Sequence, residues 1–390
     1  MPPPGLEVDL GEPHRWDVGS GPLVVGRSPE LTAPGSGGTL AQGPEEMPMS
    51  EDPVVDVMWM IRGAWVTMSI RAGCRLEVFD HLVEPRSVTW LAEATASDPG
   101  ALRRLLRVLA ELELLAEGAD DTFVDTDLGS TLTRDHPRSL RSLVLMQSWL
   151  PNVATWNHLD DAVHSGAGVY ERVNGAPPWE HLSAHPDQEV EFNRSMARRA
   201  DGQVAAIVAG IDLADAETVV DVGGGRGAML AGVLRAWPRL TGVVADRPDV
   251  AADADAAFAD AALSDRAHGV GTDFFESVPS GADVYFLSNV LHDWDDDDCL
   301  RILRTVRAAM DADSRLVLVE RLLGVPGRSA AEVRDLTFVD LHMLVMFGAR
   351  ERTKAEYDAL LVEAGFRRGE LIGPELSWNL IETQPAVPTE

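Results

Sequence analysis

Cysteine, long apolar segments and basic residues are all scarce in this sequence of 390 residues. Cys74 and Cys299 lie far apart without a Cys-x-x-Cys spacing, which argues against a disulfide framework or a zinc site and favours two buried apolar side chains. No apolar run approaches the roughly 20 residues that a membrane span requires, and the chain does not begin with a basic segment followed by an apolar one. We therefore expect a cytoplasmic protein without metal or membrane partners.

Basic residues are outnumbered by acidic ones, 33 against 63, and the formal net charge is −30. Such a charge repels nucleic acid, because nucleic-acid binding depends on neutralising phosphates. We interpret the acidity as a solvated surface and expect no nucleic-acid partner. The contents of 45% hydrophobic and 25% charged residues are typical of a globular protein.

The length favours two domains flanked by tails. Proline and glycine interrupt any periodic pattern over residues 1–52, so we expect a disordered tail there. The pattern then predicts a helical domain over 53–150, a helical connector over 151–211, an α/β domain over 212–384 and a short tail over 385–390.

Apolar residues cover a broad face of the helical stretch predicted over 53–82, which favours a subunit interface over packing within one chain. Short helices near 87–94 and 101–109, followed by a hairpin-like segment at 123–126, predict a helix-turn-helix with a small wing. This module either binds DNA through Arg103, Arg104 and Arg107 or serves dimerisation. The acidic charge favours dimerisation.

The C-terminal half alternates strands with helices, which predicts a doubly wound parallel sheet with helices on both faces. The predicted strands cover 218–222, 240–245, 267–272, 284–289 and 316–320. A further helix is predicted over 354–361, and a final hairpin runs through Leu371 and Trp378.

A glycine cluster follows the first of these strands: Asp221, Val222, Gly223, Gly224, Gly225, Arg226, Gly227 and Ala228. The cluster fits the dinucleotide pattern G-x-G-x-x-G/A, so alone it allows a nicotinamide dehydrogenase as well as an S-adenosylmethionine enzyme. Asp221 stands where dehydrogenases usually have an apolar residue, which favours the methyl donor. Asp246 follows the second strand and would hold ribose hydroxyls, whereas Asp273 and Phe274 follow the third and would hold an adenine.

The fourth strand leads into Ser288, Asn289, Val290, Leu291, His292, Asp293 and Trp294. His292 leaves a strand at the edge where ligands bind in open α/β sheets, beside an acid and an aromatic ring, so we interpret it as functional. Four aspartates at 295–298 then open a helix, where N-capping explains them better than metal binding.

These segments, together with Arg350, Glu351, Arg352 and Thr353, occur in the order found in S-adenosylmethionine-dependent O-methyltransferases. From Pro53 to Thr383 the chain resembles the class that includes plant caffeate-type enzymes and bacterial enzymes of aromatic polyketide and antibiotic biosynthesis. The resemblance implies S-adenosylmethionine as cofactor, no metal, a Rossmann-like catalytic domain and a homodimer formed through a winged-helix dimerisation domain.

The resemblance also implies roles for individual residues. His292 would be the general base that deprotonates a phenol, a group with a pKa near 10, and Glu320 and Glu351 would orient it. The expected cofactor-binding residues are Asp221, Gly223, Gly224, Gly225, Asp246, Arg247, Asp273, Phe274 and Ser288. The expected acceptor-binding residues are Met146, Trp156, Phe192, Met196, Asp293, Met343 and Phe347, and Trp149 is expected to shape the pocket with them.

Three positions depart from the family pattern. Arg247 replaces a common leucine, Ser288 replaces a usual lysine or arginine that contacts the cofactor, and Ala349 replaces the second glycine before the Arg-Glu-Arg-Thr segment. His292 is retained, so methylation of a phenolic or similar hydroxyl on a secondary metabolite is the expected reaction. A hydroxylase or decarboxylase on the same fold is the alternative.

Overall fold

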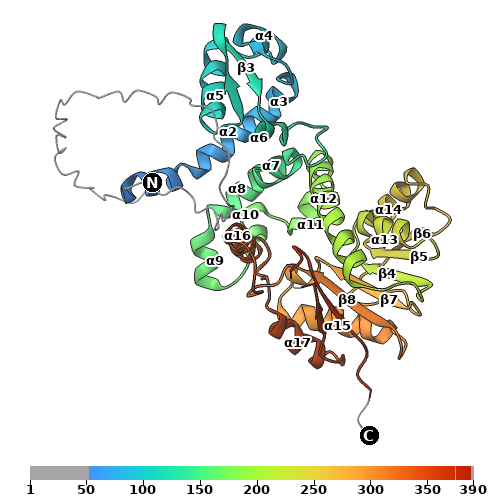
Figure 1. Ribbon diagram of the computed structural model, residues 1–390. Coiled ribbons are helices and arrows are strands. Elements are labelled where there is room, and N and C mark those ends of the chain that lie inside the picture. The colour runs from blue at the N-terminus through green and yellow to red at the C-terminus, as the bar shows by residue number, and fades with distance from the viewer. Residues whose placement is uncertain (1–51, 374, 388–390) are drawn as a thin grey trace, which may run out of the picture. The chain divides into compact units, whose positions relative to one another are not determined.

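The computed structural model describes residues 52–373 and 375–387 (Figure 1). The tails predicted at 1–52 and 385–390 therefore lie outside the described residues, apart from Asp52 and residues 385–387. The described chain packs as one unit, so the boundaries proposed at residues 150 and 211 stay predictions.

Three helices occupy the stretch expected to be one helical segment: α1 (Pro53–Ile61), α2 (Gly63–Arg75) and α3 (Val78–His81). Asp52 caps the first, its carboxylate accepting a hydrogen bond from the amide of Val54 at 2.9 Å. Glu77 adopts a left-handed conformation (φ 56°), which separates α2 from α3. No residue of α1 is buried, so its apolar side chains face outward.

The helix-turn-helix with a small wing is confirmed. It contains α4 (Val88–Ala94), α5 (Pro99–Glu111), the short turn η1 (Ala119–Asp121) and the strands β1 (Arg86–Ser87), β2 (Leu115–Glu117) and β3 (Thr122–Asp125). The strands pair antiparallel in the order β1-β3-β2. Phe79, Leu91, Leu106 and Phe123 are fully buried in its core. Arg103 of α5 pairs with Asp121 of the turn.

Helices lead from this module to the catalytic half, as the sequence predicts. They are α6 (Asp127–Ser130), α7 (Arg141–Gln147), α8 (Leu150–Trp156), α9 (Leu159–Ser165), α10 (Tyr170–Asn174), α11 (Pro178–Ser183) and α12 (Pro186–Gly210). The long helix α12 contacts α7 at one end and α13 of the catalytic half at the other (Figure 1).

A seven-stranded sheet of order β6-β5-β4-β7-β8-β10-β9 forms the centre of the described catalytic half. Its strands are β4 (Thr218–Val222), β5 (Thr241–Asp246), β6 (Ala267–Gly271), β7 (Val284–Ser288), β8 (Arg315–Glu320), β9 (Glu370–Ile372) and β10 (Asn379–Thr383). The first five pair in parallel within about one residue of the predicted bounds. The C-terminal hairpin adds β10 and β9 antiparallel, so the sheet is mixed rather than purely parallel.

Helices cover both faces of this sheet: α13 (Ala228–Ala236), α14 (Pro248–Asp260), α15 (Asp296–Ala309) and α17 (Lys354–Glu363). Successive residues of each strand enter opposite cores, as in β7, where Tyr285 and Leu287 pack with α15 and α17 while Val284 and Phe286 pack with α12 and α13. A further helix, α16 (Ala330–Phe347), returns to the helical half and contacts α8, α9 and α10.

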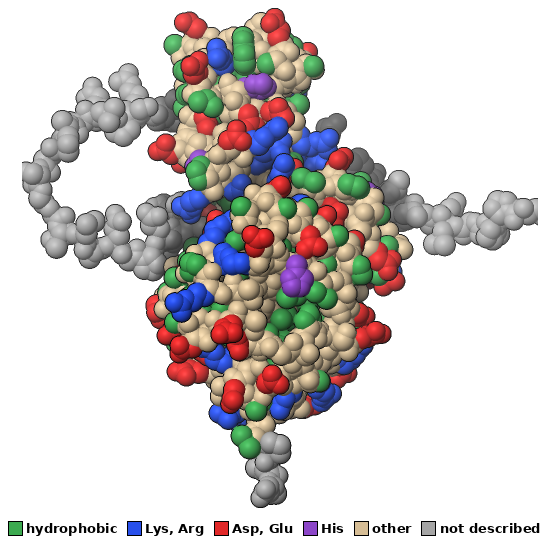
Figure 2. Space-filling view, turned by 90° about the vertical axis from the view of Figure 1, so that its right-hand side faces the viewer, with side chains coloured by type: hydrophobic (Ala, Val, Ile, Leu, Met, Phe, Trp, Pro, Cys, Tyr) green, Lys and Arg blue, Asp and Glu red, His purple; other side chains and the backbone are tan. Residues whose placement is uncertain are grey.

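On the face shown in Figure 2, acidic and basic side chains are interspersed. Cys74 and Cys299 are buried and free, as expected. Among the helices that the structure describes, none has both the length and the apolar character needed to cross a bilayer.

Candidate active site

The glycine turn connects β4 to α13 at the carboxyl edge of the sheet. Gly223, Gly225 and Gly227 have positive φ angles of 70°, 58° and 74°, which side chains other than glycine rarely adopt. A Cβ atom on Gly224 would lie 2.4 Å from Oδ2 of Asp221. The turn therefore presents a backbone without side chains beside the buried carboxyl group of Asp221.

Asp221 is fully buried, and neither of its carboxyl oxygens has a hydrogen-bond partner among the described residues. Burial, reinforced by the charge of Asp246, raises the pKa of Asp221 to about 8. Asp246 accepts hydrogen bonds from the amides of Gly225 at 2.9 Å and Arg247 at 2.7 Å. An uncompensated carboxyl at a bare turn suits a ligand with cationic and hydroxyl groups.

The next strands place further polar and aromatic side chains at the same edge. Asp273 follows β6 and accepts a hydrogen bond from the amide of Phe275 at 2.9 Å. The Phe274 ring lies 6.0 Å from the Trp294 ring. The hydroxyl of Ser288, at the end of β7, is buried without a partner among the described residues. One cavity is lined by Asp273, Phe274, Ser288 and Trp294 together with Asp221, Asp246 and the glycine turn.

His292 lies in the short turn η2 (Leu291–Asp293), which follows β7. Its Nδ1 lies 2.8 Å from Oε1 of Glu351, and its Nε2 lies 3.4 Å from Oδ1 of Asp293. Glu320 has no direct hydrogen bond to His292 but accepts one from the amide of Leu291 at 3.2 Å. We call Asp293, Glu320 and Glu351 the acidic cluster.

The acidic cluster sets the charge state of the imidazole. Burial alone lowers the pKa of His292, but the charges of the cluster and the Glu351 hydrogen bond outweigh it and raise the pKa to about 9. Burial raises the pKa of Glu320 to about 8 and that of Asp293 to about 6. A buried imidazole with a strong proton affinity thus faces the cavity.

Arg352 holds the His292 turn in place. Its buried guanidinium donates to the carbonyls of Leu291 and Trp294, both at 2.8 Å, and to Asp296 at 2.8 Å. Asp295 caps α15, its carboxylate accepting from the amide of Asp298 at 2.9 Å, which confirms the capping interpretation. Across the described residues, no group of three or more His, Cys, Asp or Glu side chains is arranged to hold a metal ion.

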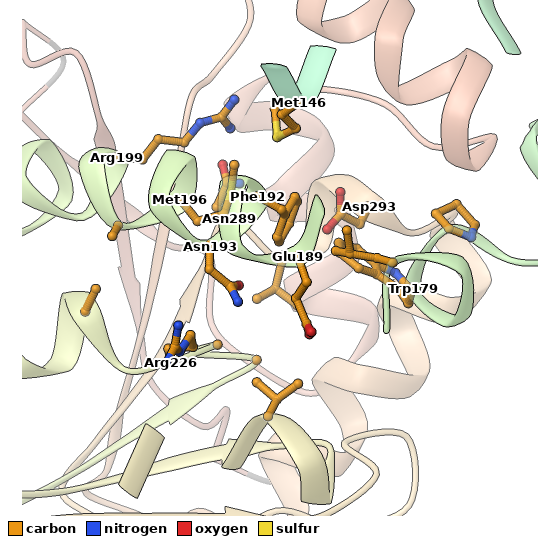
Figure 3. Close-up of a pocket in the computed structure, with 18 of the residues that line it drawn as sticks. Met146, Trp179, Glu189, Phe192, Asn193, Met196, Arg199, Arg226, Asn289 and Asp293 are labelled. Carbon is orange, nitrogen blue, oxygen red and sulfur yellow. The ribbon is translucent and has the colours of Figure 1, made fainter. Parts of the chain in front are cut away.

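The cavity has a volume of about 1950 Å³ (Figure 3). Beyond the glycine turn it is lined by Trp149, Trp156, Phe192 and Phe347, and we call this part the aromatic chamber. Every expected cofactor- and acceptor-binding residue lines the cavity, as does His292. Glu320 and Glu351 are not among the lining residues; they lie behind the His292 turn.

Several lining residues were not predicted from the sequence: Trp179, Asn193, Arg199, Asn289 and His342. Trp179 stacks on Phe347 with ring centroids 5.5 Å apart, and the indole of Trp156 donates to Nδ1 of His342 at 3.0 Å. Asn289 has a positive φ of 58° at the end of β7, a strained conformation that often accompanies function. Nothing in a helical pattern distinguishes such residues from ordinary packing positions.

Comparisons with known proteins agree with this geometry. Residues 156–367 match the O-methyltransferase domain, and residues 58–135 match the O-methyltransferase dimerisation domain. The mitomycin biosynthesis 6-O-methyltransferase of Streptomyces lavendulae is 38% identical over 320 residues, covering 82% of this chain and 89% of that protein.

Solved structures show the same architecture. The mitomycin 7-O-methyltransferase MmcR aligns with a TM-score of 0.80 at 36% identity, covering 86% of this chain and 98% of that one. NcsB1 from neocarzinostatin biosynthesis, solved with S-adenosylmethionine and 2-hydroxy-5-methyl naphthoic acid, aligns with a TM-score of 0.72 at 30% identity, covering 82% and 95%. The chain therefore belongs to the O-methyltransferase family and is an S-adenosylmethionine-dependent enzyme.

Proposed function

We propose that this enzyme methylates a phenolic hydroxyl of a small aromatic secondary metabolite, with His292 as the general base. The observation that carries the proposal is the position of His292. The imidazole lines the cavity, and its turn follows β7, which pairs with β4, and contacts α16. Glu351 contacts its Nδ1 at 2.8 Å. The relatives named for antibiotic biosynthesis support the class of acceptor.

The cofactor would be held by the residues around the glycine turn. When bound, S-adenosylmethionine supplies an electrophilic methyl group on a sulfonium. The unpartnered carboxyl of Asp221 would ionise beside a cationic ligand, and Asp246 has lone pairs left for hydroxyl groups. Asp273 and Phe274 would hold and cover the adenine of the cofactor. Ser288 offers a hydroxyl where the family usually has a cationic side chain.

His292 would take the proton of the acceptor hydroxyl on Nε2. Glu351 would accept the Nδ1–H, which leaves the lone pair of Nε2 for the acceptor. The raised pKa of His292, about 9, lies close to the value near 10 of a phenol, so the proton transfer is nearly balanced. The acidic cluster then stabilises the imidazolium.

The chamber walls would position the acceptor ring. Their apolar and aromatic side chains are Met146, Trp149, Trp156, Phe192, Met196, Met343 and Phe347. Holding the hydroxyl oxygen in line with the methyl group replaces a bimolecular encounter and lowers the entropic part of the barrier. We further propose that two copies of the chain associate through the N-terminal helices.

Transfer of label from methyl-labelled S-adenosylmethionine to a panel of phenols tests the proposal. We expect His292→Ala to lower kcat by about 10² to 10⁴-fold, the usual contribution of a general base, with S-adenosylhomocysteine affinity retained. His268→Ala, which changes an exposed histidine on β6, is the matched control. Unimpaired transfer by His292→Ala would refute the base, and cofactor binding without any methylated product would favour a hydroxylase or decarboxylase.

A further inference from the structure

We infer that Arg199 and His342 form a subsite for a carboxylate of the acceptor, so that the substrates are hydroxylated aromatic acids. The inference rests on the proposed function only in that the bound ring is taken to be the methyl acceptor. Both side chains line the chamber, Arg199 from α12 and His342 from α16.

Arg199 is a cation without a counterion in contact. Among the described residues, no carboxylate oxygen lies within 4.0 Å of its guanidinium and no hydrogen bond engages it. Its neighbour Arg321 is neutralised by Asp335 at 2.8 Å. Figure 3 shows Arg199 on the same side of the cavity as Met146 and Met196.

The other arginines that line the cavity are different. Arg194 pairs with Glu191 at 3.3 Å, Arg226 with Asp253 at 3.6 Å and Arg247 with Asp249 at 3.4 Å. Arg235 is exposed to solvent. Arg199 alone among these five is partly buried and lacks an acidic partner within the described chain.

Keeping such a cation costs free energy unless a ligand compensates for it. Burial, and next the charge of Arg321, lower the pKa of Arg199, but a guanidinium stays protonated in proteins. Asp293, Glu351 and Asp335 act on it only through longer-range attraction. The planar guanidinium presents two parallel N–H groups, the geometry that binds a carboxylate in a bidentate manner.

His342 adds a neutral donor. Burial, together with the charges of Arg199 and His292, lowers the pKa of His342 to about 4, so the ring is uncharged at neutral pH. Its Nδ1 accepts the hydrogen bond from Trp156 at 3.0 Å, which places the ring proton on Nε2. No described residue accepts that proton.

The chamber thus offers one fixed cation and one fixed neutral donor, neither with an acceptor of its own. A carboxylate has two oxygens and the charge that satisfies both. A neutral carbonyl would leave the guanidinium uncompensated, and an amine would be repelled by it. The base His292 lies in the same chamber, so one ring can present its acid to Arg199 and its hydroxyl to His292.

Binding to the enzyme saturated with S-adenosylhomocysteine tests the subsite. The probes are 1,4-dihydroxy-2-naphthoic acid, a hydroxybenzoic acid and the methyl ester of each, titrated calorimetrically. We expect the acids to bind at least about 10-fold more tightly than their esters. Arg199→Met should weaken acid binding by about 10- to 100-fold and change ester binding less than about 3-fold, as expected for a lost charge-assisted bond.

The acid-to-ester ratio is measured within each variant, so it does not depend on the folded fraction. Arg199→Lys keeps the positive charge but lacks the two parallel N–H groups, so it should give an intermediate acid-to-ester ratio. The His342 ring stacks on Trp156 with ring centroids 5.9 Å apart. His342→Phe keeps this stacking and should lower the ratio less than Arg199→Met. Arg304→Met, which removes an exposed arginine of α15, should leave the ratio unchanged.

Equal loss of acid and ester binding in Arg199→Met, or acids that bind no better than esters to the unaltered enzyme, would overturn the subsite. The proposed function fails separately. Acid binding that depends on Arg199 without any methyl transfer would keep the subsite and refute the function. Methylation of phenols together with an acid-to-ester ratio near one would keep the proposed function and refute the subsite.

Discussion

At the scale of single residues, the site is governed by carboxyl groups that are buried around one imidazole. The acidic cluster offers three carboxyl groups to His292, and burial raises the pKa of two of them, Asp293 and Glu320. Protons are therefore easily shared within the cluster near neutral pH. The same charges make His292 a stronger base than free imidazole.

The raised pKa of His292 predicts the pH dependence of the reaction. A general base must be neutral, so kcat/KM should rise with pH and level off above about 9, the pKa of His292. Glu351→Gln removes a negative charge that raises this pKa, so the midpoint should move to lower pH. The maximum rate should also fall, by about 10-fold or more, because the imidazolium loses a stabilising partner.

Steady-state rates of the unaltered enzyme and of Glu351→Gln, measured between pH 6 and about 10, test this prediction. The conservative Glu351→Asp should recover part of the rate and part of the midpoint. An unchanged midpoint in Glu351→Gln, or a kcat/KM that falls between pH 7 and about 9 in the unaltered enzyme, would contradict the assignment of the base.

At the scale of elements, α1 and α2 present apolar side chains without a partner in the described chain. Ile61 is 72% exposed and Trp65 is 70% exposed, and no residue of α1 is buried. Exposed apolar surface of this extent marks an interaction site. Residues 58–135 match a dimerisation domain, which supports our proposal that the partner is a second copy of the chain.

Replacing both Ile61 and Trp65 by glutamate should convert a dimer into a monomer. Two desolvated charges at the centre of an apolar interface oppose association strongly. Sedimentation velocity measures the change, and Val362→Glu on α17, where the valine is 50% exposed, is the control. A double variant that sediments like the unaltered protein would place the interface elsewhere.

Elements were predictable where the pattern was local. The short runs of β-branched and aromatic residues at 218–222 and 284–288 predict strands to within a residue, and the order of strands and turns brings the glycine turn, Asp246 and His292 to one edge of the sheet. The chain was expected to be helical over 53–82. The break at Arg62 is followed by Gly63, a residue that favours a helix boundary, whereas the break at Glu77 contains neither glycine nor proline and follows no local rule.

Other features depend on distant parts of the chain. The helix α16 was not predicted, although its capping box of Ser329 and Glu332 was a usable signal. Arg199 and His342 lie in different helices and line one cavity only because α12 and α16 both border it. A charged residue in a helical pattern is expected on the solvated face, so its unpaired state becomes visible only in three dimensions.

At the scale of the whole molecule, one cavity joins two kinds of surface. Its glycine-turn end is polar and acidic, and its other end is built from aromatic and methionine side chains of the connector helices and α16. The turn that carries His292 borders both ends, since it follows β7 beside β4 and contacts α16. We propose that the acceptor hydroxyl reaches the cofactor beside His292.

A crystal structure with S-adenosylhomocysteine and a methylatable phenol would measure the distance between the acceptor hydroxyl oxygen and Nε2 of His292. We expect a hydrogen bond of about 2.6–3.2 Å, with the ring between the aromatic walls and the homocysteine sulfur on the side of the oxygen away from His292. A phenol bound in the same chamber with its reactive hydroxyl beyond hydrogen-bond reach of His292 would contradict it.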